Sequence, residues 1–294
     1  MVLTTAPAAR VLPASRPMHI ADALIAERAP RLTSAVWWPL VRPAMYRLLN
    51  YFRARRMADA IQPMSGADAM AFVSELLSLK VETRGLENVP AQGRCVVICN
   101  HPTGIADGVA VFDALKPVRA DLIFYANADA LRVCPRLGEV VIPVEWVEGK
   151  RTREKTRVTL KASQAAFEAE RPLVVFPAGR IARRAPDGRL CDPEWQPTAL
   201  SLARKHEAPI VPIHVAGPWS TLFHFFNRFS PELRDITLFH ELLNKRGRRF
   251  GLTVGPTIPP EALGPDLTAA NERLKHYIEV ELPAAPDRRF SIDG

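Results

Sequence analysis

From about residue 80 onward, short apolar runs alternate with helix-length amphipathic segments. The apolar runs cover residues 94–100, 121–127, 139–146, 172–177, 208–217 and 250–258. Most of them are continuous hydrophobic stretches, as expected of strands that are covered on both faces. Segments with helical periodicity cover about 152–170, 197–206, 219–228 and 267–282. This order predicts an α/β fold whose central, largely parallel sheet is flanked by helices.

The pattern before residue 80 is different, so the chain divides into three parts. Residues 1–20 are rich in Ala and Pro and lack the long apolar stretch of a secretory signal, and we expect a flexible tail there. Residues 21–79 form an N-terminal helical segment in this interpretation, and residues 80–294 form the α/β domain. A chain of 294 residues can bury one large core beside such an accessory segment.

The N-terminal segment contains one stretch, residues 34–56, that combines five aromatic residues with five arginines. Pro39, Arg42 and Pro43 interrupt its apolar run, which is therefore too short for a membrane span of roughly 20 residues. Aromatic side chains sit well at the level of lipid headgroups, and arginines are attracted to anionic lipid. The segment therefore fits the membrane interface, and a core helix surrounded by solvated arginines is the alternative.

The chain is basic, with 39 Lys and Arg against 31 Asp and Glu and a formal charge of +8. Such a charge favours anionic partners, namely phosphorylated substrates, anionic lipids or nucleic acid. The four cysteines, Cys95, Cys99, Cys134 and Cys191, have no zinc-type spacing. Buried thiols in a reduced, cytosolic setting fit this arrangement.

A polar turn, Asn-His-Pro-Thr-Gly-Ile-Ala-Asp-Gly, follows the first of the long apolar runs and occupies residues 100–108. The imidazole of His101 can take a proton from an alcohol, and a carboxylate such as Asp107 can orient that ring and stabilise the imidazolium. Pro102 and Gly104 would help to turn the chain so that the two side chains meet. A helix N-cap with a structural histidine is the alternative interpretation of this turn.

A second polar turn, Val-Val-Phe-Pro-Ala-Gly-Arg-Ile-Ala-Arg-Arg, covers residues 174–184. Gly179 permits a close approach of the backbone, and backbone amides in such a turn suit an oxyanion or a phosphate. Arg180 and Arg183 follow, and arginine binds phosphate in a bidentate manner. Taken alone, the segment is also compatible with a solvated basic loop.

The two turns together resemble motifs of the glycerolipid (lysophospholipid) acyltransferase superfamily, which includes the 1-acylglycerol-3-phosphate acyltransferases. That family has an Asn-His turn that ends in Asp, followed by a Phe-Pro-x-Gly turn, here Phe176-Pro177-Ala178-Gly179. A Val-Pro pair in an apolar strand, Val211-Pro212, matches a third motif. Residues 241–260 resemble the hemolysin-like or ornithine-lipid-type branch, and the resemblance covers about residues 80–260.

Two positions depart from the common pattern of the family. His101 and Asp107 enclose five residues, whereas the commonest motif encloses four. The version found here resembles that of the hemolysin-like branch, so we expect the turn to absorb the extra residue. Ala178 stands where relatives commonly carry a glutamate. A contact of that carboxylate is therefore missing, which bears on the identity of the acceptor more than on the reaction.

The resemblance implies transfer of a fatty acyl group from a thioester to the hydroxyl of a lysophospholipid or related lysolipid. By resemblance, His101 is the general base and Asp107 orients it. The implied substrate-binding residues are Thr103, Gly104, Phe176, Pro177, Gly179, Arg180 and Arg183, with amides of Thr103, Gly104 or Gly179 as donors to the oxyanion.

The same resemblance has implications for partners and location. A thioester is already activated, so no metal or other cofactor is expected, and acyl-CoA or acyl carrier protein is the donor. We expect a cytoplasmic protein that lies peripherally on the anionic inner face of the membrane. The basic run at residues 149–157 opens a helix near a ligand contact of the family, with a solvated helix face as the alternative.

Other functions remain open from the residues alone. A non-catalytic lipid-binding or membrane-binding protein of the same fold would use the basic surface, but it would not need a base with its orienting carboxylate. A hydrolase would replace the lysolipid by water. Nucleic acid is not an expected partner, because no binding motif is present and the aromatic residues cluster with apolar ones.

Overall fold

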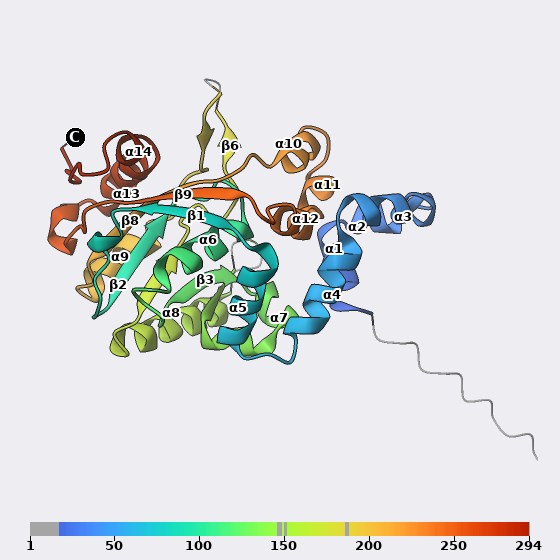
Figure 1. The fold of residues 1–294 in the computed structure, drawn as a ribbon, viewed down its shortest axis with the longest axis horizontal. Coiled ribbons are helices and arrows are strands. Elements are labelled where there is room, and N and C mark those ends of the chain that lie inside the picture. The colour runs from blue at the N-terminus through green and yellow to red at the C-terminus, as the bar shows by residue number, and fades with distance from the viewer. Residues whose placement is uncertain (1–17, 146–148, 150–151, 186–187, 294) are drawn as a thin grey trace, which may run out of the picture.

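The structure is a computed structural model, and it describes residues 18–145, 149, 152–185 and 188–293. Within these residues, seven strands form one sheet in the order β1-β9-β8-β2-β5-β3-β4 (Figure 1). Most of the flexible tail expected at the N-terminus, residues 1–17, lies outside the described residues. The strands of this sheet are β1 (Lys80–Arg84), β2 (Cys95–Cys99), β3 (Ile123–Asn127), β4 (Val141–Val144), β5 (Pro172–Val175), β8 (Ile210–Ala216) and β9 (Arg249–Val254).

Five of the six strand pairings in this sheet are parallel, and β8 with β9 is antiparallel. Every residue of β2 and β5 is buried, which is why these strands are continuous apolar runs in the sequence. All six apolar runs form strands, so the predicted α/β fold with a largely parallel sheet is confirmed. A two-stranded antiparallel ribbon, β6 (Arg183–Arg184) with β7 (Leu190–Cys191), projects beyond the sheet.

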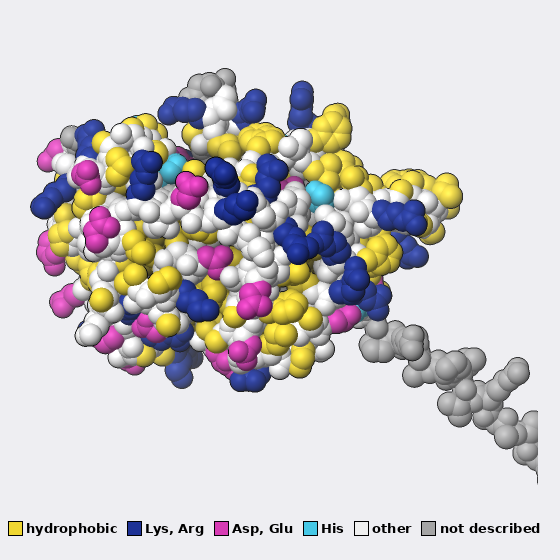
Figure 2. All heavy atoms as spheres, viewed as in Figure 1, with side chains coloured by type: hydrophobic (Ala, Val, Ile, Leu, Met, Phe, Trp, Pro, Cys, Tyr) yellow, Lys and Arg dark blue, Asp and Glu magenta, His cyan; other side chains and the backbone are white. Residues whose placement is uncertain are grey.

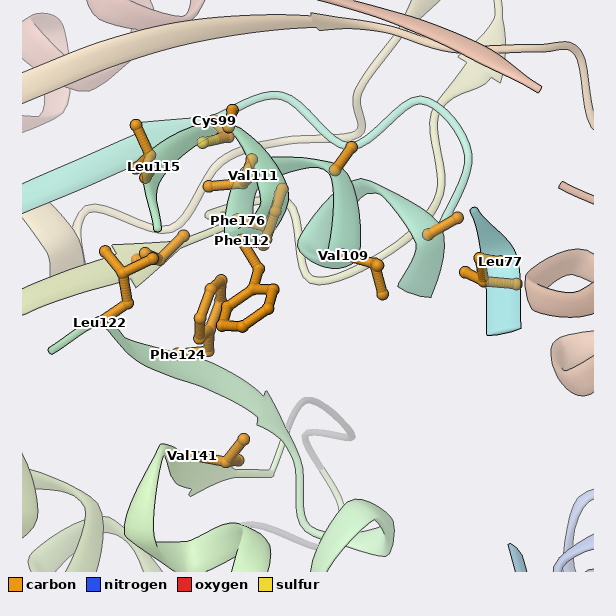
Figure 3. Packing of buried hydrophobic residues seen from close by; sticks show 14 of the residues in the cluster. Leu77, Cys99, Val109, Val111, Phe112, Leu115, Leu122, Phe124, Val141 and Phe176 are labelled. Atoms are coloured by element: carbon orange, nitrogen blue, oxygen red, sulfur yellow. The ribbon is translucent and has the colours of Figure 1, made fainter. Parts of the chain in front are cut away.

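Helices cover both faces of the sheet. They are α1 (Ile20–Arg28), α2 (Pro30–Ser34), α3 (Trp38–Leu48), α4 (Tyr51–Ile61), α5 (Gly66–Leu77), α6 (Ile105–Leu115), α7 (Asp129–Val133), α8 (Arg153–Glu168), α9 (Thr198–Lys205), α10 (Thr221–Asn227), α11 (Pro231–Asp235), α12 (Leu238–Leu243), α13 (Leu267–His276) and α14 (Leu282–Ala284). A π-helical turn, Tyr277–Glu281, joins the last two helices. One buried cluster lies under α5 and α6 and includes Phe112, Phe124 and Phe176 (Figure 3), and a second lies under α9 and α13.

Several elements were not predicted from the sequence, among them β1 and α6. The edge strand β1 has the sequence Lys-Val-Glu-Thr-Arg and is half-exposed, so it lacks the apolar run that marks the central strands. Helix α6 begins at Ile105, directly behind the first polar turn, and eight of its eleven residues are buried. A helix buried on most sides lacks the polar stripe of an amphipathic helix, which explains why its periodicity is weak.

The N-terminal helical segment packs against the α/β part at more than one place. Arg28 in α1 forms an ion pair with Asp129 in α7, at 2.7 Å, and Asn50 contacts His240 in α12 at 3.1 Å. The predicted interfacial stretch is not one helix, because Asn50 has a left-handed backbone conformation (φ 57°) and separates α3 from α4. The segment is thus attached to the core through α1, α4 and the turn before α4.

The aromatic residues of this stretch are divided between the interior and the surface. Trp38 and Tyr51 are buried, and the Tyr51 hydroxyl donates to Asp22 at 2.7 Å. Trp37 and Phe52 are exposed, as are the aliphatic side chains of Val36 and Leu40, which are 97% and 84% exposed. Each of the two interpretations therefore fits part of the stretch. In the described part of the chain, no helix combines the length and the apolar run that crossing a bilayer requires.

Candidate active site

The two polar turns leave the sheet side by side. Strands β2 and β5 are parallel neighbours, with Val97 opposite Val174, so both chains reach the same edge at their carboxyl ends. This edge is where ligands gather in open α/β sheets. The turn after β2 carries His101, and the turn after β5 carries Phe176, whose ring centroid lies 4.6 Å from that of the imidazole.

His101 and Asp107 meet, as the sequence predicts. The imidazole Nδ1 lies 2.9 Å from Oδ2 of Asp107, and the side chain of His101 is 17% exposed whereas the carboxylate is fully buried. Within the described residues, Nδ1 has no partner with the alignment of a straight hydrogen bond. The distance is compatible with a base and its orienting carboxylate, since catalytic hydrogen bonds are often poorly aligned before a substrate binds.

Asp107 is fixed by the start of α6, not by the polar turn alone. Its carboxylate accepts hydrogen bonds from the backbone N–H groups of Thr103 and Gly104, at 2.8 and 3.0 Å, and from the Thr103 hydroxyl at 2.5 Å. Asp107 is the third residue of the helix, where a negative charge is stabilised. The N-cap interpretation of this turn is confirmed, and it is geometrically compatible with the catalytic interpretation, because one carboxylate caps the helix and faces His101.

Gly104 makes this turn possible. Its backbone has φ 96°, a conformation that residues with a side chain rarely adopt. A Cβ atom at this position would also lie 2.9 Å from Cδ1 of Ile181 in the second turn. Glycine is thus required both by the backbone conformation and by the close packing of the two turns.

Asn100 ties the first turn to the neighbouring strand β8. Its side chain donates to the carbonyl of Val215 at 3.0 Å and accepts from the Val215 N–H at 2.6 Å. The pairing of β2 with β8, which ends at Cys99 and Ile213, is thereby continued by a side chain that imitates a backbone partner. This pair of bonds fixes the residue immediately before His101.

Asp192, which the sequence analysis did not single out, holds the backbone of His101. Both of its carboxylate oxygens accept from the His101 N–H, at 3.0 and 3.1 Å, and Oδ2 also accepts from the Trp195 indole at 2.9 Å. Asp192 follows the β6–β7 ribbon and lies 91 residues from His101 along the chain. No local pattern marks such a contact, since it depends on how the ribbon folds back.

The environment of Asp192 is unusual for a carboxylate. Burial, reinforced by the nearby carboxylate of Glu279, raises the pKa of Asp192 to about 7, against the lowering effect of His101 and its N–H. Glu279 belongs to the π-helical turn and accepts from the Asp192 N–H at 2.7 Å. A chain of contacts therefore runs from the C-terminal helices through Asp192 to His101.

The amides predicted as donors to an oxyanion have partners inside the protein. Those of Thr103 and Gly104 donate to Asp107, and that of Gly179 donates to the carbonyl of Phe176 at 3.0 Å, which closes the second turn. Gly179 has φ 58°, as this tight turn requires. These three amides therefore donate inside the protein in this structure, and an oxyanion site in the turn around Thr103-Gly104 or Gly179 stays a prediction.

The predicted arginines belong to a segment that lies beside the turn with His101. The Ala182 N–H donates to the His101 carbonyl at 2.9 Å, which places the Arg180–Arg183 segment along the first turn. Arg180 is exposed, and the Arg183 guanidinium lies over the Phe223 ring at 4.8 Å. Burial and the nearby charges of Arg234 and Arg180 lower the pKa of Arg183. Three cations thus gather here, and Arg234 is a member that the sequence analysis missed.

A cavity of about 150 Å³ opens on the other side of the second turn. Its walls include Tyr125, Val144 and Val175 at the ends of three strands, together with Pro177 and the first turns of α8. The exposed lining is mostly apolar. The Phe176-Pro177 pair therefore separates the imidazole, beside Phe176, from an apolar cavity beside Pro177.

Comparison with known proteins identifies the family. A family model described as "Acyltransferase" matches residues 80–216. A "Lyso-glycine lipid O-acyltransferase" of Phocaeicola vulgatus is 31% identical over 200 residues, which are 66% of this chain and 70% of that protein. A protein of the same name from Bacteroides thetaiotaomicron is 28% identical over 211 residues, or 70% of this chain and 75% of that protein.

A solved structure is similar as well. It is that of the 1-acyl-sn-glycerophosphate (LPA) acyltransferase PlsC from Thermotoga maritima, with a TM-score of 0.46 and 15% identity. The match covers 90% of this chain and 99% of that one. On the strength of the curated relatives and the family model, the chain belongs to the acyltransferase family and is an O-acyltransferase of the glycerolipid type.

Proposed function

We propose that this protein transfers a fatty acyl group from an acyl thioester to a hydroxyl of a lysolipid, with His101 as the general base. The observation that carries the proposal is the pairing of His101 with the buried Asp107 at the carboxyl edge of the sheet. A carboxylate at Nδ1 leaves Nε2 of the ring to take the hydroxyl proton. Such base catalysis is worth about 10²–10⁴-fold in rate.

The proposed reaction balances without any further reagent. The lysolipid oxygen attacks the thioester carbonyl while His101 takes its proton, the carbon–oxygen bond forms, and the carbon–sulfur bond then breaks. The leaving thiolate receives the proton from the imidazolium. Because a thioester is already activated, no metal or nucleotide cofactor takes part in this scheme.

The substrates follow from the surroundings of the two turns. Arg180 and Arg183 belong to the segment that runs along the His101 turn, and this suits an anionic head group on the lysolipid. Arg234 lies near Arg183 and is paired with Asp235 at 2.6 Å. The cavity beside Pro177 suits part of an acyl chain because its lining is mostly apolar. The curated relatives are named for lyso-glycine lipid, so a lysolipid with an amino-acid head group is the first acceptor to test.

The proposed place of action is the inner face of the membrane, with the protein bound peripherally. Trp37 and Leu40, in α3 and the turn before it, are exposed, and so are Phe225 and Phe229 in and after α10. Helices α3 and α10 lie at the right and upper right of the view in Figure 1, where Figure 2 shows exposed hydrophobic side chains. Exposed arginines such as Arg42 lie beside them. This mixture of apolar and basic side chains suits an anionic lipid surface.

The decisive experiment compares purified wild-type protein with His101→Ala and Asp107→Asn. Each is incubated with palmitoyl-CoA and either lyso-glycine lipid or lysophosphatidic acid, and the products are identified by mass spectrometry. We expect the acylated lipid with the wild type, no product above background with His101→Ala, and a loss of at least about 100-fold with Asp107→Asn.

Exposed His276 supplies the matched control, and His276→Ala should retain full activity. Full turnover by His101→Ala with an intact fold would reject the general-base role. Release of free palmitate without acylated lipid would indicate a hydrolase. Lysolipid binding without any turnover of a panel of thioesters would indicate the non-catalytic, lipid-binding alternative.

A further inference from the structure

The first half of helix α8 carries basic side chains that the proposed reaction does not use. Arg153, Arg157 and Lys161 are exposed and lie at positions i, i+4 and i+8, so they form one stripe along the helix. Within the described residues, none of the three has an ion-pair partner. Lys150 and Arg151, which precede the helix, lie outside the described residues.

Two apolar side chains border this basic stripe. Val158 is 53% exposed and Leu160 is 46% exposed, and helical geometry places them on opposite sides of Arg157. From Arg153 to Lys161 the stripe is about 12 Å long, at 1.5 Å per residue. The surface is therefore a convex strip of cations with aliphatic margins, and it lacks aromatic side chains.

The arrangement works against the stability of the helix itself. Like charges at i and i+4 repel, at a cost of about 0.2–0.5 kcal/mol per pair. Cations in the first turns of a helix also oppose its dipole, which favours negative charge at that end. Glu154 in the first turn complements the dipole and offsets part of these penalties. The repulsion along the stripe is left, and an acidic partner would relieve it.

The strip also lies at the mouth of the cavity beside Pro177. Lys155, Thr156, Thr159 and Leu160 of α8 all line that cavity, so Leu160 belongs to both surfaces. Pro177 also lines this cavity, and Phe176, the preceding residue, packs against His101. A molecule that docks on α8 thus lies beside a cavity whose lining includes Pro177, one residue from the Phe176 ring that packs against His101.

We propose that α8 is the docking surface for an acidic carrier protein that delivers the acyl group as a thioester on a flexible arm. This inference rests on the proposed function and specifies its donor. Binding would pair acidic side chains of the carrier with Arg153, Arg157 and Lys161. Val158 and Leu160 would be covered at the margins of the contact, in keeping with the mixed character of protein interfaces.

A protein fits this surface better than the two other anionic partners. Small ligands such as coenzyme A bind in concave sites, whereas the stripe is convex. The membrane is the other candidate, but α8 lies at the lower edge of the molecule in Figure 1, remote from α3 and α10 at its right and upper edges. Aromatic side chains, which mark lipid interfaces, are exposed there and are absent from the stripe.

The test compares two donors on one charge-reversal variant. Arg157→Glu/Lys161→Glu is assayed with palmitoyl-loaded acyl carrier protein and with palmitoyl-CoA, each with the better lysolipid. At low salt, about 50 mM, we expect the KM for the loaded carrier to rise at least about tenfold, with kcat nearly unchanged. The kcat/KM for palmitoyl-CoA should stay within about twofold of the wild type, because α8 is not expected to bind coenzyme A.

Arg84→Glu/Arg289→Glu is the matched control, since it changes the net charge equally at two exposed positions away from α8. It should leave the KM for both donors unchanged.

An equal loss with both donors, or no change with the carrier, would overturn the inference. So would a wild type that uses only palmitoyl-CoA, although the proposed function would then stand. Loss of vesicle binding with normal use of the carrier would assign α8 to the membrane. No transfer from either donor would reject the proposed function itself.

Discussion

At the scale of single residues, the turn that carries His101 is held by its backbone on both sides of the imidazole. The His101 N–H donates to Asp192, and the His101 carbonyl accepts from Ala182. Asn100, one residue earlier, is bonded twice to Val215. The ring therefore has little freedom except rotation of its own side chain, which is the kind of preorganisation that a general base requires.

The variant Asp192→Asn tests whether the backbone contacts of His101 preorganise its imidazole. The amide keeps one oxygen for the His101 N–H, but its NH₂ group would face the Trp195 indole N–H or the backbone donor, so one hydrogen bond is lost. We expect kcat to fall about 10- to 100-fold while the KM for the lysolipid changes little. Steady-state kinetics measure both, and Asp287→Asn, at an exposed position, is the control.

The same variant yields a prediction for the pH dependence of stability. The pKa of Asp192 is raised to about 7 in the folded protein, from an ordinary value of 3.8. Between these values the folded state keeps a proton that the unfolded state has released, so this group lowers the stability as the pH rises. The free energy of unfolding, measured with urea at about pH 5 and about pH 7.5, should fall less between these two pH values for Asp192→Asn than for the wild type. An equal loss would contradict the assignment.

Gly104→Ala is expected to damage both fold and activity. The added Cβ would impose strain at φ 96° and would contact Ile181 at 2.9 Å, and such strain costs about 1–3 kcal/mol. Gly251→Ala is the comparison, because a Cβ there meets Ala216 at an ordinary 3.9 Å. The melting temperature and the rate of acyl transfer should both be clearly lower for Gly104→Ala than for Gly251→Ala. Equal behaviour would mean that the turn tolerates a side chain.

The sequence predicts part of the site and misses part of it for a physical reason. His101 and Asp107 lie six positions apart, so a local turn brings them together and the motif reveals them. Asp192 and Glu279 reach the same turn only through the ribbon and the last helices, at sequence separations that carry no periodic signal. The hydrogen bonds from the Thr103 and Gly104 amides to Asp107 could not be predicted from the sequence either, because they depend on where α6 begins.

At the scale of elements, burial decides what can be predicted. The fully buried strands β2 and β5 are evident as apolar runs, whereas the half-exposed β1 is not. Helix α6 was not predicted because it is buried on most sides and so lacks the polar stripe of an amphipathic helix. The antiparallel pairing of β8 with β9 also escapes prediction, since strand direction follows from the intervening helices and not from the composition of either strand.

The N-terminal segment carries a prediction about membrane binding. In Val36→Ser/Leu40→Ser, two side chains that are 97% and 84% exposed become polar, so the folding stability should change little. If they enter the lipid surface, the loss of apolar burial weakens binding to anionic vesicles by about tenfold or more. Vesicle co-sedimentation measures the affinity, and an unchanged melting temperature is the control. Undiminished binding would assign the contact to another face.

At the scale of the whole molecule, the charge of +8 adds a long-range attraction to any anionic surface. Binding to anionic vesicles should therefore weaken as salt rises from about 50 to 500 mM, where the screening length shortens from about 14 Å to about 4 Å. Sedimentation across this series measures the slope. Binding that does not depend on salt would mean that apolar contacts alone hold the protein on lipid.

The repulsive stripe on α8 has a consequence for anyone who engineers this enzyme. Exchanging Arg153 or Arg157 for an acidic or neutral residue removes unfavourable charge from the start of a helix, so screens for heat resistance would favour such changes. If α8 binds the acyl carrier, those stabilised variants would have lost the docking contact on which turnover depends. Selection for thermal stability alone would then enrich variants that unfold at higher temperature but no longer bind the acyl carrier.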